Sequence, residues 1–230
     1  STGRDFHPDG VWRARARGPG FLGAGGGGGV VSQGRRFDGA GAYVDPRVGS
    51  SWYGINCDHL TVSLWVKPET ATEGATPFGS ETLGYDTSGA IPSNRCFYTR
   101  MHTVGYSKTW ALTVHDTEKP LGNYATNQWQ MITLVMSNGT AYGSVNGGAR
   151  TNAGSYADLV LGVAPMLGKR NGGTNAFKGA IDEFRLSRVV RSAAWTRAEY
   201  STVMQFPSYG VVGPAGEINP DADGNGLPDA

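Results

Sequence analysis

Three strand-length segments, far apart in the chain, constrain the fold more than any other feature of the sequence. In residues 60–68, aliphatic side chains alternate with Thr, Ser, Trp and Lys until a proline ends the segment. Residues 36–44 and 178–186 are also largely apolar, and each carries at least one acidic side chain. Alternation with a period of two is typical of a β-strand that buries one face against a core. The chain is therefore predicted to be an all-β sandwich.

The composition agrees with a single sandwich domain. The chain has 230 residues, with 36 glycines, 10 tyrosines and 6 tryptophans, and only 17% of its residues are charged. Such a chain is long enough for one large core, and this composition suits strands and turns better than helices. The formal net charge of +1 gives no electrostatic footprint for nucleic acid. Because no apolar run reaches the ~20 residues that cross a bilayer, membrane insertion is not expected either.

Turn signals divide the rest of the chain into further strands. Residues 129–136 are apolar at both parities, which is typical of a strand that is covered on both faces. The Asn-Gly pairs at 138–139 and 146–147 predict tight turns. Ser192 is a candidate N-cap for one short helix over residues 193–203. The remaining strands are predicted in residues 95–101, 109–115, 141–145, 166–169 and 176–186.

Four phrases together resemble a known family, the laminin-G-like, concanavalin-A-like jelly-roll domains of bacterial extracellular proteins. The resemblance covers about residues 1–204, and residues 191–200 are similar to the closing helical turn of that family. It implies two packed antiparallel sheets, a secreted or cell-surface location, frequent structural calcium, and roles in carbohydrate binding or adhesion. The phrases that carry it, in this order, are residues 37–44, 60–68, 129–135 and 179–187.

The N-terminal segment departs from the family pattern. Residues 1–10 resemble the loop that follows the first strand of the family, so that strand is expected to be missing. An empty strand position leaves backbone N–H and C=O groups unpaired, which is costly where they are buried. One hypothesis is that a neighbouring subunit or a precursor segment adds a strand there. The alternative is a shorter, solvated edge.

Two aspartates are candidates for a structural calcium site. Asp182 shares strand parity with the apolar residues that follow it, so its carboxylate is expected to point into packed material and to need a partner there. The resemblance implies calcium at this position, with Asp38 as a second ligand beside backbone carbonyls and water. The alternative is a salt bridge from Asp182 to Arg35, Arg36 or Arg185.

The C-terminal residues contain a second calcium-loop pattern. Residues 1–206 are interpreted as the jelly-roll domain, and residues 207–230 as a tail rich in Gly, Pro and Asp. The tail follows the oxygen-ligand spacing D-x-D-x-N-G and resembles the calcium loops of dockerin and thrombospondin-type repeats. It ends before the glutamate expected at the twelfth position, and an acidic flexible linker is the alternative. The candidate ligands are Asp221, Asp223, Asn225 and Asp229.

Two cysteines, Cys57 and Cys96, allow a single disulfide. In a secreted protein this bond would close a loop of about forty residues and stabilise the fold by about 4 kcal/mol. The alternative is a pair of buried, reduced thiols.

Aromatic side chains in loops or near strand ends are candidates for a carbohydrate-binding surface, because sugars stack on aromatic rings beside a few polar groups. A place in the core is the alternative for each of them, as for most aromatic residues of a sandwich. The candidates are Trp52, Tyr53, Tyr85, Tyr106 and Trp110.

The sequence argues against catalysis. Related glucanases place two carboxylates at alternate positions of one strand, on one face, to act together on a glycosidic bond. Asp182 and Glu183 are adjacent, so in a regular strand their side chains point to opposite faces. No nucleophile motif such as G-x-S-x-G accompanies the four histidines.

The sequence therefore predicts a calcium-stabilised, non-catalytic extracellular module that binds glycans or mediates adhesion. A structural subunit of a surface assembly or filament, completed by a strand from a neighbour, is the alternative. A glycoside hydrolase is a more distant one.

Overall fold

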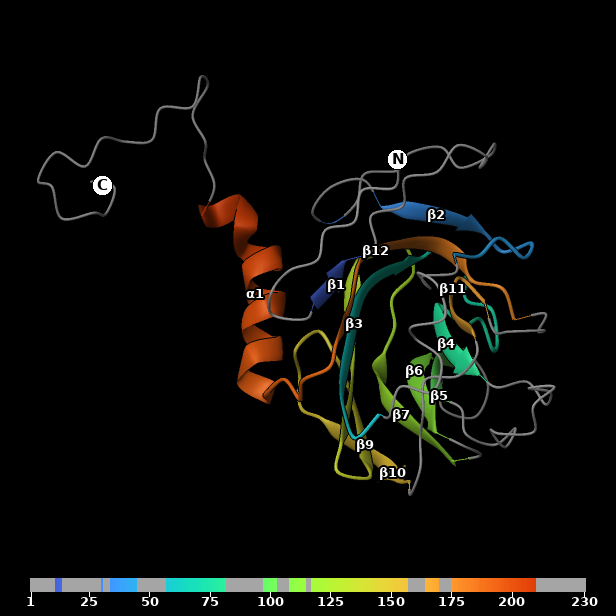
Figure 1. Cartoon of the computed structure of the whole chain (residues 1–230). Helices are drawn as coiled ribbons and strands as arrows, with labels where there is room; N and C mark the ends of the chain where they lie inside the picture. The colour runs from blue at the N-terminus through green and yellow to red at the C-terminus, as the bar shows by residue number, and fades with distance from the viewer. Residues whose placement is uncertain are drawn as a thin grey trace, which may run out of the picture.

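The described chain folds into two antiparallel sheets packed face to face, with one helix outside them (Figure 1). A computed structural model describes residues 11–13, 30, 34–44, 57–81, 97–102, 108–114, 117–156, 164–169 and 175–209. The larger sheet contains β1 (Val11–Arg13), β2 (Arg35–Asp38), β3 (His59–Pro68), β8 (Gln130–Ser137), β9 (Thr140–Val145), β10 (Thr151–Ser155) and β12 (Lys178–Ser187). The smaller sheet contains β4 (Phe78–Glu81), β5 (Phe97–His102), β6 (Thr109–Val114), β7 (Thr117–Asn123) and β11 (Ala164–Leu167). The helix is α1 (Ala193–Tyr209).

The strand order is that of a jelly-roll sandwich, as the sequence predicts. In the larger sheet the order is β1-β12-β3-β8-β9-β10, with β2 beside β12, and in the smaller sheet it is β11-β4-β5-β6-β7. The predicted Asn-Gly turn joins β8 to β9, and Asn138 and Gly139 take the positive φ values of +45° and +74° that such a turn requires.

The core lies between the two sheets. Leu60, Val62 and Leu64 of β3 face it and are fully buried, as their alternation predicts. Removal of each such side chain from water stabilises the fold by about 1.5–3 kcal/mol. β8 lies between β3 and β9 and is buried on both faces, which confirms its prediction as a central strand.

A bulge in β12 changes which residues face the core. Asp182 is paired with Trp65 of β3, but Arg185 is paired with Ser63, so two residues of β12 lie opposite one residue of β3. Glu183 has a left-handed φ of +47° at this point. The predicted parity is therefore wrong: Phe184 faces the core, whereas Asp182 lies on the outer face beside Trp65.

The outer edge of β12 is paired with strands of the same chain. β2 pairs with its first residues, from Lys178 opposite Asp38 to Ile181 opposite Arg35. β1 pairs with its last residues, ending at Ser187 opposite Val11. The structure gives no support for strand addition at this edge, and addition elsewhere stays a prediction.

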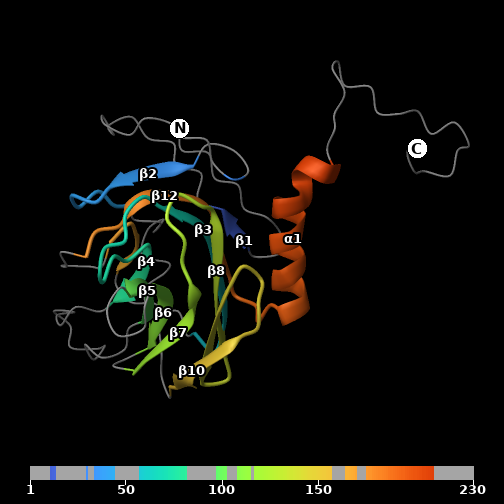
Figure 2. The ribbon, with the colours of Figure 1, turned by 180° about the vertical axis from the view of Figure 1, so that it is seen from behind.

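Helix α1 packs on the outer face of the larger sheet, and the views from both sides agree on this placement (Figures 1 and 2). Ser192 Oγ accepts a hydrogen bond from the backbone N–H of Trp195 at 3.0 Å, which confirms the predicted N-cap. The ring of Tyr200 stacks on Trp65 with centroids 5.6 Å apart. The helix is longer than predicted and continues through Pro207 to Tyr209, so the predicted boundary at residue 207 falls inside it.

Three strands lack the alternation that would predict them. β4 is only four residues long, β10 reads Thr-Asn-Ala-Gly-Ser, and β7 contains Pro120. β7 and β11 are the two edges of the smaller sheet, and β11 also contains a proline, Pro165. A proline is tolerated at an edge because its missing N–H breaks no hydrogen bond inside the sheet.

Candidate functional site

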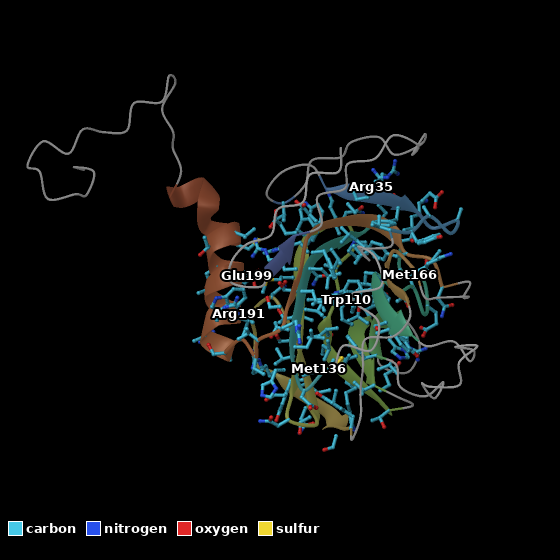
Figure 3. All side chains as sticks on the ribbon, viewed as in Figure 1. Arg35, Trp110, Met136, Met166, Arg191 and Glu199 are labelled. Carbon is cyan, nitrogen blue, oxygen red and sulfur yellow. The ribbon has the colours of Figure 1, made fainter. Side chains whose placement is uncertain are left out.

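The two sheets differ in what covers their outer faces. Glu199 and Tyr200 of α1 contact Ser63 and Trp65 on the outer face of the larger sheet. Figure 3 shows Glu199 between the helix and this sheet, and the smaller sheet lies on the opposite side of the molecule from α1. The outer face of the smaller sheet is therefore the sheet surface that α1 leaves uncovered.

Polar side chains are concentrated on the outer face of the smaller sheet, but most of them are buried: Tyr98, His102, Thr109 and Thr113 are each at most 8% exposed. In β5, Phe97 and Met101 point into the core, so Tyr98, Arg100 and His102 point outward. The cross-strand partners of these three residues in β6 are Thr113, Ala111 and Thr109, and Glu118 of β7 lies opposite Thr113.

Glu118 is the centre of a network of charged side chains. Its carboxylate accepts a hydrogen bond from Thr113 Oγ1 at 3.0 Å and pairs with Arg100 Nε and with His102 Nε2. The other ring nitrogen of His102, Nδ1, lies 3.1 Å from Glu73 Oε1. We refer to Glu73, Arg100, His102, Thr113 and Glu118 as the charged cluster.

The charged cluster is partly accessible and holds its central carboxylate ionised. The side chains of Arg100 and Glu118 are 25% and 16% exposed. Burial acts to raise the pKa of Glu118, but the hydrogen bonds and charges of Arg100 and His102 outweigh it, so the pKa of this carboxyl lies below its ordinary value. A carboxylate held in this state accepts hydrogen bonds from hydroxyl groups and is a poor proton donor.

The two predicted calcium ligands, Asp38 and Asp182, are not brought together. Asp38 lies opposite Lys178, which is four residues before Asp182 along β12, or on the order of 13 Å. Asp38 is exposed, and its Oδ1 accepts a hydrogen bond from the N–H of Ala40 at 2.8 Å. Asp182 is buried, and its Oδ1 accepts one from the N–H of Glu183 at 2.9 Å. The pairing of β2 with β12 therefore does not bring the two carboxylates into one calcium site.

Trp110 is not available as a surface for stacking. Its side chain is fully buried between the sheets, where Figure 3 shows it, and its Nε1–H donates to Gln130 Oε1 at 3.2 Å. Its ring also contacts Tyr124 edge-on, with centroids 5.8 Å apart. The prediction of Trp110 as a ligand-binding residue is therefore wrong, because its strand parity places it in the core.

The other predicted site residues lie outside the described part of the chain. They are Trp52, Tyr53, Tyr85, Tyr106, Cys96, Asp221, Asp223, Asn225 and Asp229. Cys57 is described and fully buried, and its carbonyl accepts a hydrogen bond from the Tyr156 hydroxyl at 3.0 Å. The disulfide therefore stays a prediction.

The sequence interpretation missed the charged cluster. Tyr98, Arg100 and His102 alternate with apolar residues and could have been assigned to one outward face of β5. Glu118 offers no such signal, since it lies in a polar segment with Pro120 that does not look like a strand.

Within the described residues, no group of three or more His, Cys, Asp or Glu side chains could hold a metal ion. No helix there is long and apolar enough to cross a membrane.

Comparison with known proteins identifies the fold independently. A laminin G family model, described as the concanavalin A-like lectin/glucanases superfamily, matches residues 37–196. No curated protein matches the sequence.

Several solved structures have the same fold. Domain 4 of AbnA, a GH43 extracellular arabinanase from Geobacillus stearothermophilus solved in complex with arabinotriose, is 19% identical with a TM-score of 0.57, and the match covers 82% of this chain and 85% of that domain. The Trypanosoma rangeli sialidase is 14% identical with a TM-score of 0.54, and the match covers 74% of this chain but 27% of the sialidase. The botulinum neurotoxin serotype D binding domain is 16% identical with a TM-score of 0.52, covering 74% and 42%. Identities this low show a shared fold alone.

Proposed function

The chain belongs to the concanavalin A-like lectin/glucanases superfamily, and from this membership we propose that it is a non-catalytic module that binds a glycan. The proposed binding surface is the outer face of the smaller sheet, around the charged cluster. The superfamily is used by both binding domains and enzymes, so the choice between them rests on the residues of this face.

The charged cluster is the observation that carries the proposal. Arg100 and Glu118, which are partly exposed, present a guanidinium and a carboxylate on a rigid sheet, and the buried imidazole of His102 holds Glu118 in place. These groups donate and accept hydrogen bonds in fixed directions, which is how hydroxyl-rich ligands are oriented. Because the network is already assembled without a ligand, binding costs little ordering of side chains.

The same network argues against Glu118 as the proton donor of a glycosidase. A glycosidase needs one carboxylic acid that gives up a proton at the working pH, usually with a raised pKa. The pKa of Glu118 is lowered instead, because hydrogen bonds from Arg100 and His102 outweigh the effect of burial. We therefore assign Glu118 the role of a hydrogen-bond acceptor.

Location and calcium are parts of the same proposal. A secreted or cell-surface location is supported by the extracellular arabinanase whose domain shares the fold. Calcium stabilisation is proposed for the loop of Asp38 or for the C-terminal Asp221–Asp229 pattern, each considered as a separate site.

The test is a binding measurement with matched variants. Arabinotriose and an array of neutral and acidic oligosaccharides are screened first, and the best ligand is then titrated by calorimetry into wild type, Arg100→Ala and Glu118→Ala. Loss of one charged hydrogen-bonding partner is expected to weaken the affinity at least about tenfold. Incubation with the same ligand is expected to release no new reducing ends.

Arg36→Ala is the matched control. Arg36 also forms an ion pair with a glutamate, with Nε 2.8 Å from Glu69 Oε1, but on the exposed edge strand β2. The affinity of the Arg36→Ala variant for the ligand is expected to stay within about twofold of wild type, since an exposed ion pair contributes little to the stability of the fold. If the folded variants of the charged cluster bind like wild type, the assigned binding surface is contradicted. If no oligosaccharide on the array binds, the proposed glycan ligand is contradicted.

A further inference from the structure

A row of polar side chains crosses the larger sheet beneath α1. Arg185 of β12, Ser63 of β3, Thr133 of β8 and Ser144 of β9 are cross-strand partners in one line. Directly opposite residues point to the same face of a sheet. This row faces outward, because neighbouring residues of the same strands, such as Leu64 in β3, face the core. We call it the hydroxyl row.

Helix α1 closes the hydroxyl row from above with an acidic side chain. Glu199 Oε1 pairs with Arg185 Nη1 and accepts a hydrogen bond from Ser63 Oγ at 3.3 Å. The Glu199 side chain is only 6% exposed. At the next outward position along β3, Trp65 stacks on Tyr200 beside the row.

Three oxygen atoms in this enclosed space have no hydrogen-bond partner among the described residues. They belong to Thr133 and Ser144, each 1% exposed, and to Glu199, whose second oxygen is Oε2. An unpaired buried hydroxyl or carboxylate oxygen costs about 1–3 kcal/mol. Thr133 is the partner of Ser144 and also of Ser63, which Glu199 contacts, so the three atoms belong to one row and the helix residue above it. Unpaired atoms grouped in this way are not expected in a native protein unless something binds near them.

We propose that the hydroxyl row is a binding site for ordered water molecules, held by Thr133 Oγ1, Ser144 Oγ and Glu199 Oε2. The Cβ atoms of a directly opposite pair lie about 4.5–5.5 Å apart, a spacing that lets one water bridge the two hydroxyls. A buried water typically makes about three hydrogen bonds, and these residues offer that number of free oxygen atoms.

The charges in the row favour water over a cation. Arg185 already brings a positive charge to Glu199, and its Nη2 also lies 2.6 Å from Glu183 Oε2. A second positive ion beside this guanidinium would be repelled.

The test compares the same chemical change at two buried threonines. Thr133→Val removes a hydroxyl from the hydroxyl row. Thr99→Val removes a hydroxyl that is also fully buried and unpaired, but whose strand neighbours Phe78 and Leu112 are apolar core residues. If water binds in the row, Thr133→Val leaves that water and Glu199 with one partner fewer. Its unfolding equilibrium constant is expected to rise about tenfold in urea titrations.

Thr99→Val is expected to leave the unfolding constant unchanged or to lower it, because an isolated hydroxyl in an apolar core only costs free energy. A crystal structure of the wild type at high resolution is expected to show water within hydrogen-bonding distance of Thr133 Oγ1 and Ser144 Oγ. The proposal would be overturned if the two substitutions changed the unfolding constant equally. It would also be overturned if that crystal structure showed no ordered water at the hydroxyl row. A midpoint of unfolding that rises with sodium or potassium chloride, but not with choline chloride, would identify a cation and overturn it too.

Discussion

Two glutamates in this protein have opposite electrostatic surroundings. The pKa of Glu118 is lowered, because the hydrogen bonds from Arg100 and His102 outweigh its burial. The pKa of Glu199 is raised, because its burial between α1 and the larger sheet outweighs the charge of Arg185. Compared with the unfolded chain, the folded state therefore shifts the equilibrium of the first side chain toward its ionised form and that of the second toward its protonated form.

This difference predicts opposite pH dependences of stability. The contribution of Glu118 is present above the ordinary carboxyl pKa and is lost as the pH falls through its lowered folded value. The contribution of Glu199 is present below the ordinary pKa and is lost as the pH rises through its raised folded value. Urea unfolding between acidic and neutral pH is the measurement. Relative to wild type, Glu118→Gln is expected to lose stability as the pH rises and Glu199→Gln to gain it. Parallel curves for the two variants would show that their surroundings do not differ in this way.

At the scale of elements, long strands with one buried face could be predicted and short edge strands could not. β3, β8 and β12 each carry apolar side chains whose spacing reports burial, and their predicted positions agree with the structure within a few residues. β7 and β10 are polar edge strands that are held mainly by pairing with one neighbour, which leaves no periodic signal in their own residues. The bulge at Glu183 could not be predicted from the sequence either, because a glutamate with positive φ is uncommon.

Substitution of a glycine by alanine is expected to destabilise the protein more in β12 than in the loop after β2. A Cβ at Gly179 would lie 2.3 Å from the carbonyl oxygen of Lys67 and 2.9 Å from Pro68 Cα, both backbone atoms of β3. Gly179→Ala is expected to destabilise the protein by more than about 3 kcal/mol or to prevent folding, since the β3–β12 pairing would have to separate. Urea unfolding or soluble yield measures the effect.

Gly41→Ala is the control for this substitution. Gly41 also has a positive φ, +112°, but no atom lies within 4 Å of an added Cβ. Its cost is expected to be about 1 kcal/mol, from backbone strain alone. Equal costs at the two positions would mean that strain, and not the contact with β3, decides the effect.

At the scale of the whole molecule, the candidate site depends on pairings that the sequence does not reveal. Arg100 and His102 share one strand and could be placed on one face by alternation, but Glu118 joins them only because β7 pairs with β6. Glu73 joins them from the loop after β3. The same reason explains why Asp38 and Asp182 were grouped wrongly, since their separation depends on the β2–β12 register.

Calcium is expected to stabilise the domain if the loop of Asp38 binds it. Thermal unfolding in excess calcium and in excess EDTA is then expected to differ by about 5 °C or more, because a ligand that binds only the folded state raises Tm. Asp38→Asn is expected to abolish the difference, whereas Asp221→Asn with Asp223→Asn is expected to leave it unchanged. The same Tm in calcium and in EDTA would contradict the site at Asp38.

The prolines at both edges of the smaller sheet affect how copies of this molecule meet. Pro120 in β7 and Pro165 in β11 each leave one backbone position without a donor. A strand from another copy that approached either edge would find its hydrogen-bond ladder interrupted there. On β11 the backbone of Val44 also pairs with Leu167 and covers part of that edge. We therefore expect fibril growth through this sheet to be disfavoured in crowded solutions, because a continuous row of free backbone donors would otherwise act as a template for it.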